Sequence, residues 1–330
     1  MAIDIARRKF IATLGGTAIA WPLAARAQQS SMPVVGFLNG SSPALSESRV
    51  DAFRQGLGEA GFVEGRNVAI EFRWAQDQVD RLPGLAADLV RLPVTVMVVS
   101  GIACTRAAKA ATATIPIAFM MGGDPVAFGL VASLNRPGGN LTGVANLSVE
   151  LGPKRLELAR ELVPTATSIA VLINPTDANA ETASRDLQVA ASKLGLKLNV
   201  LHASAEGDFD EAFASLVQLR AGALVIGDGT FYNYRPEKLG ALALRHAVPA
   251  IFQYREFAAA GGLISYGDSL TDPYHRLGLY TGRILKGEKP VDLPVQQSTK
   301  VELIINLKTA KGLGITVPLA LLGRADGVIE

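Results

Sequence analysis

Residues 95–143 read TVMVVS-GIACTRAAKAATAT-IPIAFM-MGGDPVAFGLVASL-NRPGGNLTG. The segments 95–100 and 115–120 are short, nearly continuous apolar runs, as is typical of parallel strands covered on both faces. The alanine-rich stretch between them has the length of a crossover helix. A further helix is expected after Gly-Gly-Asp-Pro, before a glycine-rich turn. This order predicts a βαβ unit in a parallel α/β sheet.

The same alternation of strand and helix patterns extends through the rest of the chain. The other predicted strands are 34–38, 67–74, 141–146, 169–173, 198–202, 223–226, 250–253 and 263–266, followed by extended or apolar segments at 291–296 and 301–305. The other predicted helices are 46–60, 82–92, 154–162, 180–194, 209–219, 236–246, 272–286 and a short stretch near 307–313. Repeated βα units predict parallel sheets with right-handed crossovers.

A sequence pattern that occurs twice in the chain indicates two similar lobes. The segments that contain Asn39 and Asn174 each show a strand ending in Asn, a polar turn with proline, and a helix that closes on glycine. The predicted fold class is therefore α/β, with two Rossmann-like lobes, parallel sheets and a hinged cleft. The expected boundaries place 33–146 with 262–297 in the first lobe, and 147–261 with 298–330 in the second.

The charge of the chain excludes some partners. The formal net charge is +2, but residues 1–27 hold four basic side chains and one acidic one. The remaining 28 basic and 29 acidic residues (32 less 4, and 30 less 1) give −1, so no basic excess argues for nucleic acid. Cys104 is the single cysteine, and the three histidines are scattered. We expect no internal disulfide, no metal site and no cofactor.

Residues 1–27 are interpreted as an export signal. Arg7-Arg8-Lys9 precedes a mildly apolar stretch, and Ala25-Arg26-Ala27 is an A-x-A cleavage site before Gln28. The paired arginines favour the twin-arginine route over an ordinary Sec signal. We expect a periplasmic protein without a permanent membrane anchor.

Ligands of open α/β sheets bind beyond the carboxyl ends of the strands, where this sequence carries small and polar residues. The candidates in the first lobe are Asn39, Ser41, Ser42, Ser100, Gly101, Gly123 and Asp124. The candidates in the second lobe are Asn174, Asn179, Asp228 and Phe231.

The candidates carry two interpretations each. Ser100, before a helix, suits an anion at the helix amino end, or it simply caps that helix. Asp124 and Asp228 either pair with a ligand ammonium group or stabilise turns. Phe231 stacks on a flat ligand or belongs to the core. Cys104 is expected to be a buried filler.

Catalytic motifs are absent from the sequence. It has no GxSxG, GxxxxGK[ST], HExxH or CxxC pattern, and its first strand lacks the GxGxxG fingerprint. We therefore expect a binding protein and not an enzyme. Two alternatives are a ligand sensor for a membrane receptor and an exported two-lobed enzyme, which would have only Asp124 and Asp228 as an acid/base pair.

A set of ordered motifs resembles the TrpX-like family of ABC transporter substrate-binding proteins, over essentially the whole mature chain. The motifs are VGFLNGSSP, AAKAATATIPIAF, GGDPVAFGLVASLNRPGGNLTG, KRLELARELVP, AVLINP, REFAAAGGLISYG, YTGRILKGEKPVDLPVQQSTK and INLKTAKGLGITVP. The resemblance implies a type I periplasmic-binding-protein fold with three hinge crossings. It also implies delivery of a small solute to an ABC permease. We expect the protein to be a monomer.

The resemblance further implies an amino acid or related carboxylate as ligand, with an aromatic amino acid as one option. Carried onto this sequence, it assigns the carboxylate to Ser42, Ser100 and Thr105, and the amino group to Asp124 or Asp228. Related sequences often have a small or proline-containing turn where this chain has Gly-Ile-Ala-Cys-Thr after Ser100. That departure leaves the ligand open.

Overall fold

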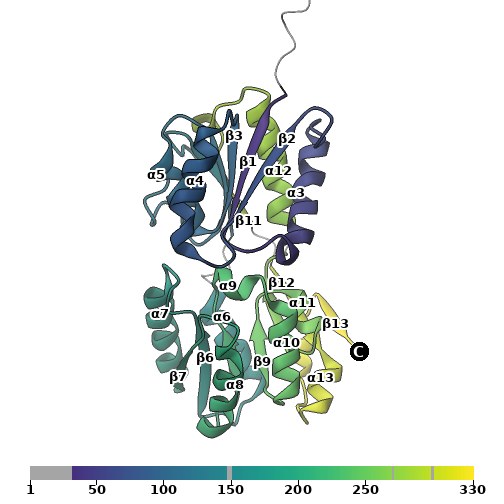
Figure 1. Ribbon diagram of the computed structural model, residues 1–330. Coiled ribbons are helices and arrows are strands. Elements are labelled where there is room, and N and C mark those ends of the chain that lie inside the picture. The colour runs from purple at the N-terminus through teal and green to yellow at the C-terminus, as the bar shows by residue number, and fades with distance from the viewer. Residues whose placement is uncertain (1–31, 147–150, 270, 299–300) are drawn as a thin grey trace, which may run out of the picture. The chain divides into compact units, whose positions relative to one another are not determined.

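Two sheets organise the chain from Val34 onward in a computed structural model that describes residues 32–146, 151–269, 271–298 and 301–330. The predicted export signal at 1–27 lies outside the described residues. Figure 1 shows each sheet with helices on both of its faces, the arrangement expected of α/β layers. The six-stranded sheet with its helices is called the first lobe below, and the seven-stranded sheet with its helices the second.

The described strands of the first sheet are all parallel and follow the order β11-β5-β4-β3-β1-β2. They are β1 (Val34–Asn39), β2 (Ala69–Trp74), β3 (Val96–Ser100), β4 (Ile117–Gly122), β5 (Leu141–Asn146) and β11 (Gln296–Ser298). The two apolar runs of the central βαβ unit are β3 and β4, which pair with each other in the interior of the sheet. Their nearly unbroken hydrophobicity follows from burial on both faces.

Four long helices cover this sheet. They are α3 (Glu47–Glu59), α4 (Leu82–Arg91), α5 (Ile102–Ala111) and α12 (Asp272–Leu285). Apolar residues of α4 and α5 pack on one face, and those of α3 and α12 pack on the other. The α3–α12 contact is close because two glycines face it: a Cβ on Gly56 would lie 1.9 Å from the His275 carbonyl oxygen, and one on Gly278 would lie 2.2 Å from that of Phe53. Short 3-10 turns are η1 (Ala44–Ser46), η2 (Val79–Arg81) and η4 (Pro290–Asp292).

The second sheet follows the order β13-β12-β10-β9-β8-β6-β7 among the described residues. Its strands are β6 (Ser168–Ile173), β7 (Lys197–His202), β8 (Leu224–Ile226), β9 (Ala250–Phe252), β10 (Ile264–Gly267), β12 (Glu302–Asn306) and β13 (Gly327–Ile329). The β10–β12 pair is antiparallel, and the other pairs described in this sheet are parallel.

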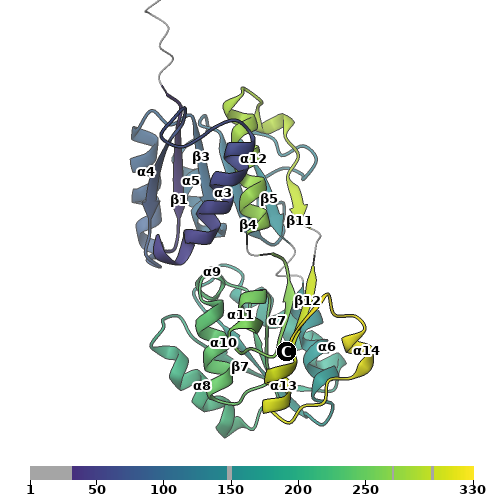
Figure 2. The same ribbon diagram turned by 90° about the vertical axis from the view of Figure 1, so that its right-hand side faces the viewer.

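The helices of the second lobe also form two layers. One face carries α6 (Gly152–Leu162), α7 (Ala180–Lys193) and α13 (Leu307–Gly312). The other carries α8 (Asp208–Leu219), α10 (Pro236–Arg245) and α11 (Arg255–Ala259). Two single-turn helices, α9 (Thr230–Asn233) and α14 (Leu319–Leu322), complete the set. Figure 2 shows α12 against the sheet of the first lobe, although β10, the strand that precedes it in the chain, lies in the second.

The chain passes between the two sheets three times: after β5, between β10 and α12, and between β11 and β12. One predicted boundary is wrong. The prediction places residues 262–267 in the first lobe, but β10 pairs with β9 and β12 in the second sheet. A βα alternation does not specify which of two sheets a strand joins, and the antiparallel pairing with β12 decides it here.

A second correction concerns the segment after Asp124, where a helix was expected. Residues 125–134 contain no helix in this structure. They form successive turns, in which the Gly129 amide donates to the Val126 carbonyl and the Leu130 amide donates to the Pro125 carbonyl. Proline and glycine close to each other favour turns over a continuous helical ladder.

Candidate functional site

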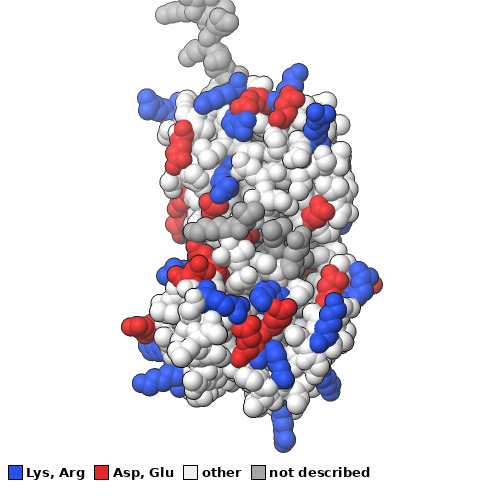
Figure 3. Space-filling model, turned by 180° about the vertical axis from the view of Figure 1, so that it is seen from behind, with Lys and Arg blue, Asp and Glu red and all other residues white. Residues whose placement is uncertain are grey.

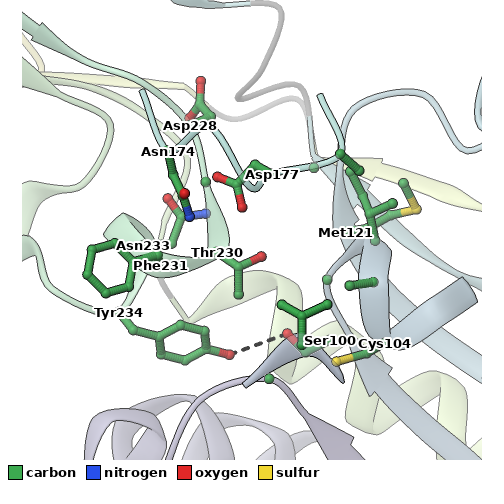
Figure 4. Close-up of a pocket in the computed structure, with 18 of the residues that line it drawn as sticks. Ser100, Cys104, Met121, Asn174, Asp177, Asp228, Thr230, Phe231, Asn233 and Tyr234 are labelled. Atoms are coloured by element: carbon green, nitrogen blue, oxygen red, sulfur yellow. Dashed lines mark hydrogen bonds between the residues drawn. The ribbon is translucent and has the colours of Figure 1, made fainter. Parts of the chain in front are cut away.

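A cavity of about 430 Å³ lies at the carboxyl ends of the strands, with walls from both lobes. Its volume falls in the range of small-molecule sites. Of the residues suggested by the sequence, those that line it are Ser100, Gly101, Asn174, Asn179, Asp228 and Phe231. Figure 4 shows residues of the second lobe, including Asp177 and Asn174, across the cavity from Ser100 and Met121 of the first.

The first-lobe wall contains the amino end of helix α5. Gly101 precedes this helix with a φ of 92°, and no side chain caps the helix at this residue. The first N–H groups of any helix lack an intrahelical acceptor, and here Ile102 and Ala103 line the cavity. The Ser100 hydroxyl does not cap the helix, because it bonds to the Tyr274 hydroxyl at 2.6 Å. This wall can therefore accept an anionic group through backbone N–H groups and the helix dipole.

The second-lobe wall is rich in acceptor oxygens. Asp177 and Asp228 both line the cavity, and within the described part of the chain no donor reaches the buried Asp177 Oδ2 and Asp228 Oδ1 atoms. Burial and the neighbouring Asp228 raise the pKa of Asp177 to about 7. A donor-rich or cationic group would satisfy both oxygens, because unpaired buried acceptors cost free energy.

Arg155 of α6 lies beneath this wall. Its Nη1 donates to Asp228 Oδ2 at 2.7 Å, and its Nε donates to the Tyr266 carbonyl at 2.8 Å. Burial raises the pKa of the Asp228 carboxyl, and the Arg155 guanidinium opposes that shift. One carboxylate oxygen of Asp228 is thus used by the protein, while the other, Oδ1, is buried without a partner among the described residues.

The aromatic residues near the cavity are largely engaged by the protein. The Phe231 ring packs 5.5 Å from the Phe209 ring, and the Arg235 guanidinium lies 4.0 Å over its face. The Tyr234 hydroxyl reaches the first lobe, where it lies 3.4 Å from Ser100 Oγ, as the dashed line in Figure 4 marks. Stacking of a ligand on Phe231, predicted from the sequence, is therefore restricted on one face.

Several predicted ligand residues lie outside the cavity lining: Asn39, Ser41, Ser42, Thr105, Gly123 and Asp124. Asn39 is buried and bonds to the Ser41 amide and to the Tyr234 hydroxyl. Ser42 uses its carbonyl to bind the Ser46 hydroxyl. The fully buried Thr105 donates its hydroxyl to the Gly101 carbonyl at 2.8 Å, within the first turn of α5.

Asp124 departs most clearly from the prediction. It is exposed, and its Oδ1 accepts the Val126 amide at 2.8 Å, which is the turn-stabilising alternative. Gly123 also turns the chain, with a φ of 82° and its amide bonded to the Asn146 carbonyl. Ligand contact by these two residues stays a prediction that the geometry does not favour.

Metal binding and thiol chemistry find little support. Across the described parts of the chain, no group of three or more His, Cys, Asp or Glu side chains could hold a metal ion. Burial raises the pKa of Cys104 to about 12, so its thiol stays protonated at neutral pH. Cys104 lines the cavity as a small apolar side chain.

Sequence reasoning missed Asp177, Thr230 and Tyr274 as lining residues. A signal existed for Asp177, which ends the polar Asn-Pro-Thr-Asp run after the predicted strand at 169–173. Tyr274 had no such signal, because it belongs to helix α12 and meets Ser100 only in the folded chain.

The molecular surface carries mixed charge. Figure 3 shows Lys and Arg side chains interspersed with Asp and Glu on one face of the molecule. Among the described residues, no helix is both long and apolar enough to cross a bilayer.

The comparisons with known proteins agree with this architecture. The chain is 29% identical over 276 residues to a tyrosine-binding protein from Clostridioides difficile (strain R20291), which covers 82% of this chain and 77% of the relative. Among solved structures, a conserved domain protein from Vibrio cholerae O1 biovar eltor superposes with a TM-score of 0.78 and 30% identity, covering 90% of this chain and 100% of the other.

A third relative is the ABC domain in complex with L-Trp from Streptococcus pneumonia. It has a TM-score of 0.79 and 25% identity, and it covers 91% of this chain and 100% of the other. Residues 32–329 match the family described as ABC transporter substrate binding protein. The chain therefore belongs to the family of ABC transporter substrate-binding proteins, with the type I periplasmic-binding-protein fold.

Proposed function

We propose that this protein binds a free α-amino acid, with its ammonium group on the second lobe and its carboxylate on the first, and delivers it to an ABC permease. One observation carries the proposal. The cavity places a helix amino end, at Gly101, opposite two carboxylates with unpaired buried oxygens, Asp177 and Asp228. A zwitterion complements both walls at once.

An aromatic side chain fits the remainder of the cavity. Part of the wall is apolar, formed by residues of η2, α4 and α5: Val79, Leu82, Pro83, Ile102, Ala103 and Ala107. These side chains offer an apolar surface without competing hydrogen-bond groups. The names of two relatives, a tyrosine-binding protein and a complex with L-Trp, support an aromatic amino acid as the ligand of this chain.

Binding without catalysis is the role supported by the chemistry of the lining. Asp228 is paired with Arg155, and the Cys104 thiol is protonated, so neither is an activated nucleophile. Export by the twin-arginine route and capture by a permease complete the proposal. Both follow from the sequence of residues 1–27 and from the family.

The test is calorimetric titration of the protein with tyrosine, tryptophan and phenylalanine. Matched analogues lacking one group, tyramine without the carboxylate and 3-(4-hydroxyphenyl)propionate without the amine, report on each wall separately. We expect loss of either group to weaken binding by about 2–5 kcal/mol, which is roughly thirty- to several-thousand-fold.

Asp177→Asn should abolish the preference for the amine-bearing ligand, while Asp124→Asn is the matched control outside the cavity. If tyramine binds as tightly as tyrosine, the carboxylate role of the α5 amino end is wrong. If Asp177→Asn leaves the affinity unchanged, the ammonium role fails.

A further inference from the structure

Tyr234 belongs to the second lobe by its place in the chain, between β8 and α10, but its side chain is bound by the first. Its hydroxyl accepts from Asn39 Nδ2 at 2.8 Å and lies 3.0 Å from the Tyr274 hydroxyl. Ser100 Oγ lies 3.4 Å from it. The side chain is 4% exposed, so the second lobe contributes a nearly buried phenol to a polar socket in the first.

Arg49 of α3 completes this socket. Its guanidinium lies 4.0 Å over the Tyr234 ring, within the range of a cation–π contact. The same guanidinium donates to the Asn233 carbonyl, so it binds the backbone as well as the ring. Its second terminal nitrogen, Nη1, donates to the Leu45 carbonyl of the first lobe at 3.0 Å. Arg49 therefore orients the segment that carries Tyr234.

The next residue in the chain makes an ion pair between the lobes. Arg235 Nη2 lies 2.5 Å from Asp77 Oδ2 of the first lobe, and its Nε donates to Glu206 of the second at 2.8 Å. Asp77 and Gln76 both adopt positive φ values, 60° and 55°, which non-glycine residues rarely do. Their amides bond to the Gly40 and Ser41 carbonyls, which hold Asp77 in place facing Arg235.

We infer that residues 233–235 form an interlobe latch, whose socket in the first lobe is Asn39, Arg49, Ser100 and Tyr274. The latch holds the lobes together through protein contacts alone, so part of the population is closed without ligand. The apparent dissociation constant of any ligand that requires closure is its intrinsic value divided by the closed fraction. Asn39 and Ser100 then act in closure. The Asn39 side-chain amide is already bound to the Tyr234 hydroxyl, and the Ser100 hydroxyl is already bound to the Tyr274 hydroxyl. This inference goes beyond the proposed function and does not depend on the identity of the ligand.

The experiment measures the distance between lobes in the ligand-free protein. Spin labels are placed on Ser48→Cys in α3 and Ala214→Cys in α8, which are exposed positions, in a Cys104→Ser background, because Cys104 lines the cavity and opening of the lobes would expose its thiol. Double electron–electron resonance then gives the ratio of closed to open molecules. Tyr234→Phe removes the hydroxyl and keeps the ring under Arg49. Tyr232→Phe is the matched control, because that hydroxyl donates to the Ala203 carbonyl within the second lobe.

We expect the closed-to-open ratio to fall about two- to tenfold in Tyr234→Phe, the range for one net hydrogen bond, and to stay unchanged in Tyr232→Phe. Asp77→Asn, at the rim of the cavity, should lower the ratio independently of the phenol socket. The inference is overturned if Tyr234→Phe and Asp77→Asn both keep the wild-type distribution, or if the wild type without ligand shows only the long distance. Failure of tyrosine or tryptophan to bind would refute the proposed ligand and leave this measurement intact.

Discussion

The Arg155 guanidinium donates a 2.7 Å hydrogen bond to the Asp228 carboxylate, and the two side chains are 0% and 7% exposed. The stability of a buried ion pair depends on both of its members, because removal of one leaves the other as an uncompensated buried charge. Asp228 lines the cavity, so the pair connects the cavity wall to helix α6 as well as stabilising the second lobe.

Replacing Arg155 with methionine should lower the free energy of unfolding by about 3–5 kcal/mol, since it leaves Asp228 buried without its partner. Chemical denaturation at neutral pH measures the loss. Arg185→Met is the control, because Arg185 is exposed on α7. The double variant Arg155→Met with Asp228→Asn should recover part of the loss. If Arg155→Met is as stable as the control, the pair does not stabilise the lobe.

Ligand affinity should depend on pH through Asp177. The pKa of its carboxyl is raised to about 7, from an ordinary value of 3.8, by burial first and by Asp228 second. The ionised form that binds an ammonium group is lost as pH falls through 7. We therefore expect the affinity for tyrosine or tryptophan to fall by about tenfold per pH unit between pH 7 and 5, as measured by calorimetry. The ligand amine keeps its charge over this interval. Asp177→Asn should bind weakly with a flat profile, and an equally flat wild-type profile would contradict the assignment.

Gly101→Ala should impair both folding and closure. The φ of 92° at this position disfavours any residue with a Cβ, and that Cβ would lie 3.2 Å from Thr230 Oγ1 of the second lobe. We expect a loss of about 1–3 kcal/mol of stability from the backbone term. Ligand binding should weaken in addition, because the added Cβ would require the Thr230 side chain of the other lobe to shift by a few tenths of an ångström. Gly84→Ala in α4 is the matched control, as nothing lies within 4 Å of its added Cβ. Unchanged stability and affinity in Gly101→Ala would count against both effects.

Asp268 should make the folded state less stable as pH rises. It is 3% exposed, and neither of its carboxylate oxygens has a hydrogen-bond partner among the residues that the structure describes. Burial raises its pKa to about 6, against the opposing effect of Arg155. A folded pKa above the unfolded value of 3.8 means that stability falls between about pH 4 and 6 and stays lower above that. Asp268→Asn should raise the melting temperature at pH 8 and leave it unchanged at pH 4. An equal shift at both pH values would show that ionisation is not the cause.

Processing of the export signal is tested on secreted material. Cleavage after Ala27 should leave Gln28, intact or cyclised, as the first residue by mass spectrometry. Replacing Arg7 and Arg8 with lysines should block export if the twin-arginine route is used. Unchanged export of the lysine variant would indicate the Sec route, and an intact Met1 on periplasmic protein would refute cleavage.

The α/β class could be read from the sequence because burial leaves a local mark. Strands β3 and β4 are covered on both faces, so their residues 96–99 and 117–121 are apolar. The rule that ligands meet the carboxyl ends of strands likewise indicates Ser100 and Asp228, which both line the cavity. Each of these inferences rests on residues close together in the chain.

Other features depend on contacts that no local pattern records. Asp124 and Asp228 share the same sequence signature beside glycine, and only burial separates them: one is an exposed turn residue, and the other is paired with Arg155, 73 residues away. Strand β10 joins the second sheet through antiparallel pairing with β12. Between these two strands the chain passes through the first lobe, where it forms α12 and β11.

The sequence by itself determined the class of fold, the family and the edge of the sheets where the cavity lies, because periodicity and strand-end composition are local. The tertiary structure decided which polar groups remain free for that ligand. Ser100 is committed to Tyr274, 174 residues along the chain, and Asn39 to Tyr234, 195 residues away. A hydrogen bond is made or lost within a few tenths of an ångström, and such a distance is set only when the lobes have packed.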